Sequence, residues 1–141
     1  MKFFYVDPEV AGDFGDETVL DTSLHPPVVS RLHYRFQGWL GDSLLETFPI
    51  FIVTEEAKRA LEKIRVSGAV FDNVQVTTGD MFQELHPDLK LPPFVWLKPE
   101  GTAGQDDFGI ASNLRLVISE RVLDLFRRLG LAHADIDSFE N

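Results

Sequence analysis

The chain has 141 residues, 44% of them hydrophobic and 26% charged, which is the size and composition of one domain with an ordinary core. Thirteen basic and 23 acidic side chains give a formal charge of −10, which excludes non-specific attraction to nucleic acid or to an anionic membrane and favours a basic partner. The absence of cysteine excludes disulfides, thiolate metal sites and a cysteine nucleophile.

The chain begins with a short apolar segment, residues 2–6, which predicts a first strand. This segment is too short for a signal peptide, and no apolar run approaches the ~20 residues of a membrane span, so we expect a soluble, cytoplasmic protein. Residues 7–27 are rich in glycine and proline and predict a long loop. The loop is strongly acidic, with Asp7, Glu9, Asp13, Asp16, Glu17 and Asp21.

The middle of the chain alternates predicted strands with a first helix. Strands are expected at 28–36, 44–48 and 50–53, the last a continuous apolar run. Thr54 is a predicted N-cap, and Glu55 and Glu56 suit the first turn of a helix. The helix has one apolar face, formed by Ala57, Ala60, Leu61 and Ile64.

The C-terminal part repeats this alternation. Ser119 is a predicted N-cap, Glu120 occupies the first helical turn, and Gly130 is a predicted C-terminal cap. The apolar face of this helix consists of Val122, Leu125, Phe126 and Leu129. The other expected elements are an extended segment at 70–76, one or two helical turns at 80–85, strands at 94–97, 114–118 and 132–139, and a loop at 99–107 that contains Asp106 and Asp107.

The two helices superpose at an offset of 65 residues. Thr54 then falls on Ser119, and the two apolar faces coincide. The strand before each helix and the extended segment after it match as well. Both an internal strand–helix–strand repeat and two independent amphipathic helices with good caps would produce this pattern.

The sequence has no motif for catalysis or for metal binding. The four histidines show no metal-ligand spacing, and the acidic run from Asp13 to Asp21 does not match a calcium loop. No nucleophile elbow, phosphate loop or dinucleotide fingerprint is present. We therefore expect no catalytic residues, no metal and no cofactor.

One segment resembles a known family. Asp106-Asp107-Phe108-Gly109 is followed by an apolar strand, and then by Ser119-Glu120-Arg121, which opens a helix that ends before Gly130. This arrangement resembles the C-terminal signature of bacterial immunity proteins that accompany polymorphic toxins, a domain of unknown function. The resemblance covers residues 75–141. It implies a non-enzymatic α+β protein that binds and neutralises a cognate toxin, with Ser119 and Glu120 as structural residues.

The acidic character agrees with that expectation, because toxins that attack nucleic acid are often basic and an acidic inhibitor associates with them rapidly. The interpretation places the toxin-binding surface at two acidic segments, with Asp13, Asp16, Glu17 and Asp21 in one and Asp106 and Asp107 in the other. A small enzyme or ligand-binding domain that uses carboxylates, and a regulatory protein-interaction domain, remain as alternatives.

Together these patterns predict a single α+β domain over residues 1–141. Its first half, residues 1–74, contains the acidic loop, and residues 75–141 form the immunity-like half. A mixed or mainly antiparallel sheet is expected to pack against two principal amphipathic helices.

Overall fold

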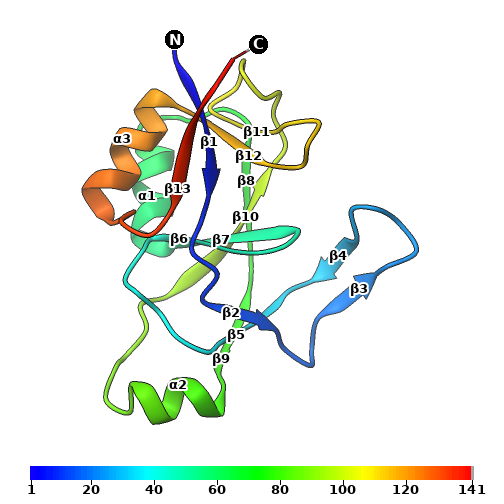
Figure 1. Cartoon of the computed structure of the whole chain (residues 1–141), viewed down its shortest axis with the longest axis vertical. Coiled ribbons are helices and arrows are strands. Elements are labelled where there is room, and N and C mark those ends of the chain that lie inside the picture. Colours follow the sequence, from blue (N-terminus) through cyan, green and yellow to red (C-terminus); the bar gives the residue numbers. More distant parts are fainter. Residues whose placement is uncertain (141) are drawn as a thin grey trace.

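The computed structural model describes residues 1–140, which form an α+β fold (Figure 1). The helices are α1 (Glu55–Lys63), α2 (Asp80–Leu85) and α3 (Glu120–Leu129). The strands are β1 (Phe3–Asp7), β2 (Gly12–Phe14), β3 (Val19–Asp21), β4 (Val28–Arg31), β5 (His33–Phe36), β6 (Leu44–Thr47), β7 (Ile50–Thr54), β8 (Ala69–Asp72), β9 (Gln75–Thr78), β10 (Phe94–Pro99), β11 (Phe108–Ile110), β12 (Leu116–Ser119) and β13 (Asp135–Phe139).

Two four-stranded antiparallel sheets have the same architecture. One has the strand order β6-β7-β10-β8, and the other has the order β11-β12-β1-β13. In each sheet a hairpin leads into a helix, and the strand after that helix lies at the far edge. The registers agree, because the N-cap Thr54 pairs with Phe94 in the first sheet and the N-cap Ser119 pairs with Phe3 in the second.

This agreement shows that the 65-residue offset is a structural repeat. Asp72 faces Trp96 in the first sheet, and Asp137, 65 residues after Asp72, faces Tyr5 in the second. Strand β10 follows β8 along the chain, whereas the corresponding strand β1 comes from the N-terminal end. The second repeated unit is therefore completed by the beginning of the chain, which lies beside β13 (Figure 1).

The two units pack through α1 and α3, which lie side by side (Figure 1). Each helix forms because a hydroxyl caps its first turn and apolar residues recur on one face. Leu61 of α1 and Phe126 of α3 are fully buried in one shared core, with Val53 and Ile118 from the preceding strands. Burial of these faces stabilises the association of the units.

A second core lies below the repeated units. Strand β5 pairs with β2 in antiparallel fashion and with β9 in parallel fashion, so the protein as a whole contains both kinds of pairing. Tyr34 and Phe36 of β5 are fully buried there, beside Phe82 of α2 and Trp96 of β10. The fold class and the two principal helices agree with the sequence prediction, and α2 is a short third helix.

Several predicted boundaries are wrong. Residues 7–27 contain β2 and β3 and are not a continuous loop. The predicted strand 28–36 is divided at the buried residue Leu32 into β4 and β5, which belong to different sheets. The extended segment 70–76 is likewise divided between β8 and β9, and β11 was not predicted. These elements are three or four residues long, so their strand pattern is too short to detect.

Strands β3 and β4 form a two-stranded sheet of their own that projects from the body (Figure 1). We call residues 16–31, which contain these strands and the turn between them, the arm. Its base is fixed by hydrogen bonds at His33: the Thr18 hydroxyl donates to the His33 carbonyl oxygen at 2.9 Å, and the His33 backbone N–H donates to that hydroxyl at 3.0 Å.

Candidate functional site

The arm exposes apolar side chains that an isolated domain has no reason to present to water. Val19, Leu24 and Val28 are 50–53% exposed, and Leu20 is 36% exposed. Two paired strands without further partners bury little apolar surface of their own. Clustered apolar side chains of this kind, bordered by charged residues, are typical of protein–protein interaction sites.

The acidic residues expected in this region lie along the arm and at its base. Asp16, Glu17 and Asp21 belong to the arm, and the Asp16 side chain is 95% exposed. Asp13 lies outside the arm on β2, where the Arg35 guanidinium donates to both of its carboxylate oxygens at 3.1 and 3.0 Å. This pair lowers the pKa of Asp13 and neutralises its charge. The negative charge that is open to a partner is therefore concentrated on Asp16, Glu17 and Asp21.

The arm borders an apolar groove with a volume of about 410 Å³. Pro26, Pro27 and Val28 of the arm form one side, and the β6–β7 turn with β10 forms the other. A smaller adjoining cavity, of about 80 Å³, shares Pro26, Pro49, Phe51 and Ile110 with this groove. The groove and the cavity together give the arm a concave apolar side.

The small cavity contains one carboxyl group, that of Glu46. Apolar side chains line the rest of it, among them Phe48, Phe51 and Leu114. Burial raises the pKa of Glu46 to about 7, and the nearby Asp7 carboxylate contributes to the rise. The sequence analysis missed Glu46, because its environment is assembled from the arm, the β6–β7 turn and residues beyond 109. The one local signal was its position next to the apolar strand 50–53.

The two acidic residues expected near residue 107 differ from each other. Asp106 is partly exposed and accepts a hydrogen bond from the Thr102 backbone N–H at 2.7 Å. Asp107 is only 6% exposed, and both of its oxygens are bound within the protein. Burial removes Asp107 from the acidic surface that was expected from the sequence.

Asp107 instead joins the two repeated units. The Arg121 guanidinium donates to Oδ1 at 2.9 Å and to Oδ2 at 2.6 Å, and the Ser119 hydroxyl donates to Oδ1 at 2.6 Å. The Ser67 backbone N–H, which follows α1 in the other unit, donates to Oδ2 at 2.9 Å. The hydrogen bonds from Arg121 hold the pKa of Asp107 at about 2. We call these residues the Asp107 junction.

The expected helix caps lie at the helix ends. Thr54 Oγ1 accepts from the Ala57 backbone N–H at 3.1 Å, and Ser119 Oγ accepts from the Val122 N–H at 3.4 Å. Glu120 is the first residue of α3. Gly130 ends α3 with a φ of +122°, a conformation that side chains disfavour, and its N–H donates to the Phe126 carbonyl oxygen.

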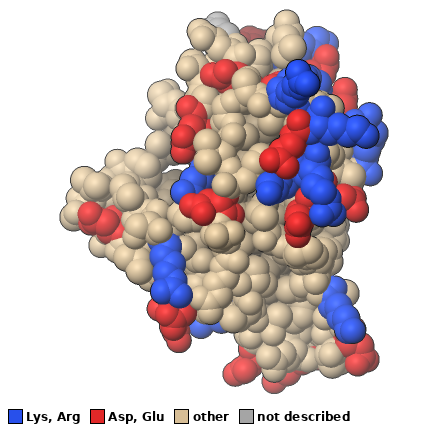
Figure 2. Space-filling model, turned by 180° about the vertical axis from the view of Figure 1, so that it is seen from behind, with Lys and Arg blue, Asp and Glu red and all other residues tan. Residues whose placement is uncertain are grey.

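Charge is separated between the helices and the rest of the protein. Residues 55–65 and 120–130 contain seven basic and five acidic side chains, which leaves six basic and eighteen acidic side chains elsewhere. Figure 2 shows the basic side chains gathered on the side of the molecule that carries α1 and α3, away from the arm. The arm therefore belongs to the acidic part of the surface.

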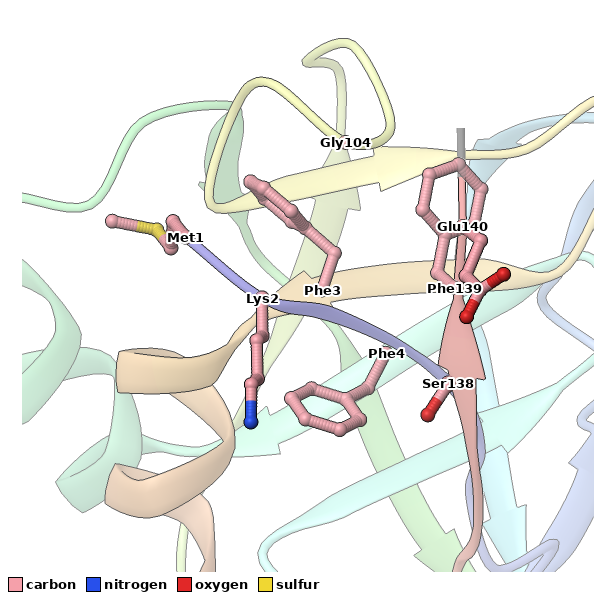
Figure 3. A pocket seen from close by; sticks show the side chains of 8 residues that line it. All are labelled: Met1, Lys2, Phe3, Phe4, Gly104, Ser138, Phe139 and Glu140. Carbon is pink, nitrogen blue, oxygen red and sulfur yellow. The ribbon is translucent and has the colours of Figure 1, made fainter.

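A further hollow, with a volume of about 500 Å³, lies where β1 and β13 meet the loop around Gly104 (Figure 3). The rings of Phe3 and Phe139 extend from β1 and β13 toward this loop, whereas Lys2 points to the other side of β1. The hollow does not bring acid and base groups together, so we assign it no chemistry.

No family model matches the chain, and no curated protein matches it. Within residues 1–140, no helix has the length and apolar character needed to cross a membrane. The functional argument therefore depends on the arm, its groove and the charge distribution.

Proposed function

We propose that the protein is a non-enzymatic immunity protein that binds and neutralises a basic cognate toxin through the arm. The observation that carries this proposal is the combination of exposed apolar and acidic side chains on one projecting hairpin. Leu24 and Val28 supply apolar contact area, and Asp16, Glu17 and Asp21 supply negative charge. Interfaces need both, because apolar burial contributes affinity and complementary charge contributes specificity and speed of association.

The groove beside the arm suits an anchoring side chain of the partner. Its apolar walls accept the stem of a lysine or arginine, and the adjoining cavity places Glu46 where the cationic end would lie. Such an end would lower the pKa of Glu46 and return the carboxyl to its charged form. Anchors of this kind, buried at the centre of an interface, contribute most of its affinity.

The charge separation supports the same orientation. A basic toxin is attracted by the acidic surface around the arm and repelled by the helical face with its basic side chains (Figure 2). The field thus favours encounters at the arm and accelerates association at low ionic strength.

The proposal is tested first by recovering the partner and then by measuring its toxicity. A tagged chain is used to capture proteins from its own cells at low and moderate salt. The dominant stoichiometric partner is then expressed alone, with the wild-type chain, or with a Leu24→Asp/Val28→Asp variant. We expect growth arrest with the partner alone, rescue by the wild-type chain and no rescue by the variant.

A matched control carries Leu85→Asp and Leu89→Asp, which change two exposed leucines outside the arm. This control should rescue growth as the wild-type chain does. Equal rescue by the arm variant and the control would refute the arm as the binding surface. A partner that is harmless when expressed alone would refute the immunity function.

One observation favours the alternative of a small carboxylate-using enzyme or ligand-binding domain. Glu46 holds a proton near neutral pH in an apolar cavity, as a general acid does. The cavity of about 80 Å³ admits only a small group. Under this alternative, Glu46→Gln would abolish turnover of a small substrate, whereas under our proposal it weakens toxin binding.

A further inference from the structure

Three side chains from distant parts of the chain meet at a second junction between the repeated units. Glu9, Asp42 and His133 each offer one oxygen or nitrogen ligand atom, and these atoms lie within 4.8 Å of one another. Glu9 is 9% exposed and Asp42 is 1% exposed, whereas the His133 side chain is 41% exposed. The cluster is thus closed on the protein side and open to solvent at the imidazole.

Asp42 occupies in this Asp42 junction the place that Asp107 has in the other. Its Oδ1 accepts from the Ala132 backbone N–H at 3.0 Å, and Ala132 lies 65 residues after Ser67, the corresponding donor to Asp107. Its Oδ2 accepts from the His133 backbone N–H at 2.8 Å. His133 Nδ1 lies 3.0 Å from Asp42 Oδ1.

The two junctions differ in how their negative charge is balanced. The Asp107 junction contains one carboxylate and the Arg121 guanidinium. The residue 65 positions before Arg121 is Glu56, which is exposed and acidic. The Asp42 junction adds a second carboxyl group, from Glu9, and within residues 1–140 neither Glu9 nor Asp42 has an ion pair with lysine or arginine.

Glu9 also has an unpartnered oxygen. Its Oε2 accepts from the Leu40 backbone N–H at 2.8 Å, whereas its Oε1 is buried and has no hydrogen-bond partner among the described residues. A buried polar atom without a partner is costly and often marks the place of a water molecule or an ion. Burial raises the pKa of Glu9, which reflects the same missing partner.

We propose that the Asp42 junction binds one divalent transition-metal ion, with Zn²⁺ as its ligand of choice, through Glu9 Oε1, Asp42 Oδ1 and His133 Nδ1. One imidazole and two carboxylates are ligands that zinc accepts, with bond lengths of about 2.0–2.2 Å. Neighbouring ligands on a tetrahedral ion then lie about 3.3 Å apart, close to the 3.0 Å between His133 Nδ1 and Asp42 Oδ1.

The ion would supply what the junction lacks. It gives Glu9 Oε1 a partner and balances two buried carboxylates, while Asp42 keeps both of its backbone hydrogen bonds. The exposed side of His133 leaves the fourth position to water. Arg121 and the metal ion would then hold the two junctions in the same way, one with a side-chain cation and the other with a bound cation.

The test is a zinc titration of the full chain after treatment with a chelator, followed by calorimetry. We expect one ion per chain, with Glu9→Gln and His133→Ala each weakening binding at least about tenfold. His25→Ala, which removes another exposed histidine, is the control and should bind zinc as the wild-type chain does. The fold of each variant is checked by circular dichroism.

The wild-type chain gives a second measurement that does not depend on the variants. Cobalt, added in place of zinc, should produce the visible absorption bands of a four-coordinate site with one imidazole and oxygen ligands. Absence of stoichiometric zinc binding by the wild-type chain overturns the proposal. It is also overturned if folded Glu9→Gln and His133→Ala variants bind zinc with unchanged affinity.

Discussion

The arm and the Asp107 junction both contain acidic side chains, but they hold them in opposite environments. Asp16 is almost fully exposed, and its one ion pair, to Arg35, spans 3.8 Å. Asp107 is buried and accepts hydrogen bonds from a guanidinium, a hydroxyl and a backbone N–H. The comparison teaches that the body uses buried charge to join its repeated units, whereas the arm keeps its charge available for another molecule.

The largest expected effect is on the Asp107 junction. Asp107→Asn should lower the free energy of unfolding by about 3 kcal/mol, because Arg121 is then left beside a neutral side chain. Urea denaturation measures this effect. Asp106→Asn, the matched control at the partly exposed neighbour, should change stability by less than about 1 kcal/mol. Similar losses in both variants would contradict a special role of the junction.

The same junction predicts a dependence on acid. The pKa of Asp107 is about 2 in the folded chain, below its ordinary value of 3.8. The unfolded chain therefore binds this proton first, and the stability contributed by Asp107 is lost as the pH falls from about 4 to 2. Asp107→Asn should remove this part of the acid dependence.

Glu46 should have the opposite influence on stability. Its pKa is raised to about 7 from an ordinary value of 4.5, so the folded chain holds the proton more tightly and stability falls as the pH rises from about 4.5 to 7. Glu46→Gln should stabilise the protein by about 2 kcal/mol at pH 8 and leave it nearly unchanged at pH 4. Thermal unfolding at both pH values measures the difference. Equal effects at pH 4 and pH 8 would contradict the assigned cause.

The two N-caps separate the repeated units from each other. Thr54→Ala should cost about 1 kcal/mol, the usual effect of losing a cap. Ser119→Ala should cost about 2 kcal/mol, because the Ser119 hydroxyl also donates to Asp107. Urea denaturation of the two variants checks the order. A larger loss for Thr54 would show that Ser119 acts as a cap alone.

The arm should show the smallest effect on stability. The triple variant Asp16→Asn/Glu17→Gln/Asp21→Asn removes three exposed charges, and it should change the free energy of unfolding by less than about 0.5 kcal/mol. A loss comparable to that of Asp107→Asn would mean that the arm charges hold the fold together and would remove the distinction between the two regions.

Local patterns explain which parts of this comparison the sequence predicted. The caps Thr54 and Ser119, both long helices and the 65-residue repeat depend on neighbouring residues, so they were visible in the sequence. The short strands β2, β3 and β11 and the division of 28–36 at Leu32 depend on partners far along the chain. Tertiary pairing of this kind overrides local propensity.

The sites depend even more on distant contacts. Asp107 was expected at the surface, because its burial requires Arg121 and the turn after α1, which a reading of adjacent residues does not join. Asp42 and His133 are 91 residues apart and show no ligand spacing. The acidic residues of the arm were identifiable from charge alone, whereas the exposed apolar side chains beside them required the structure.

The association rate of the purified chain with its captured partner, measured against salt, tests the central claim most directly. The triple arm variant is compared with Glu62→Gln/Glu84→Gln/Asp88→Asn, which removes three exposed acidic charges outside the arm. The account predicts that the arm variant associates about tenfold more slowly at low salt, with a weaker salt dependence, and that the control stays near the wild-type rate. Equal rates for the two variants would contradict steering and binding by the arm.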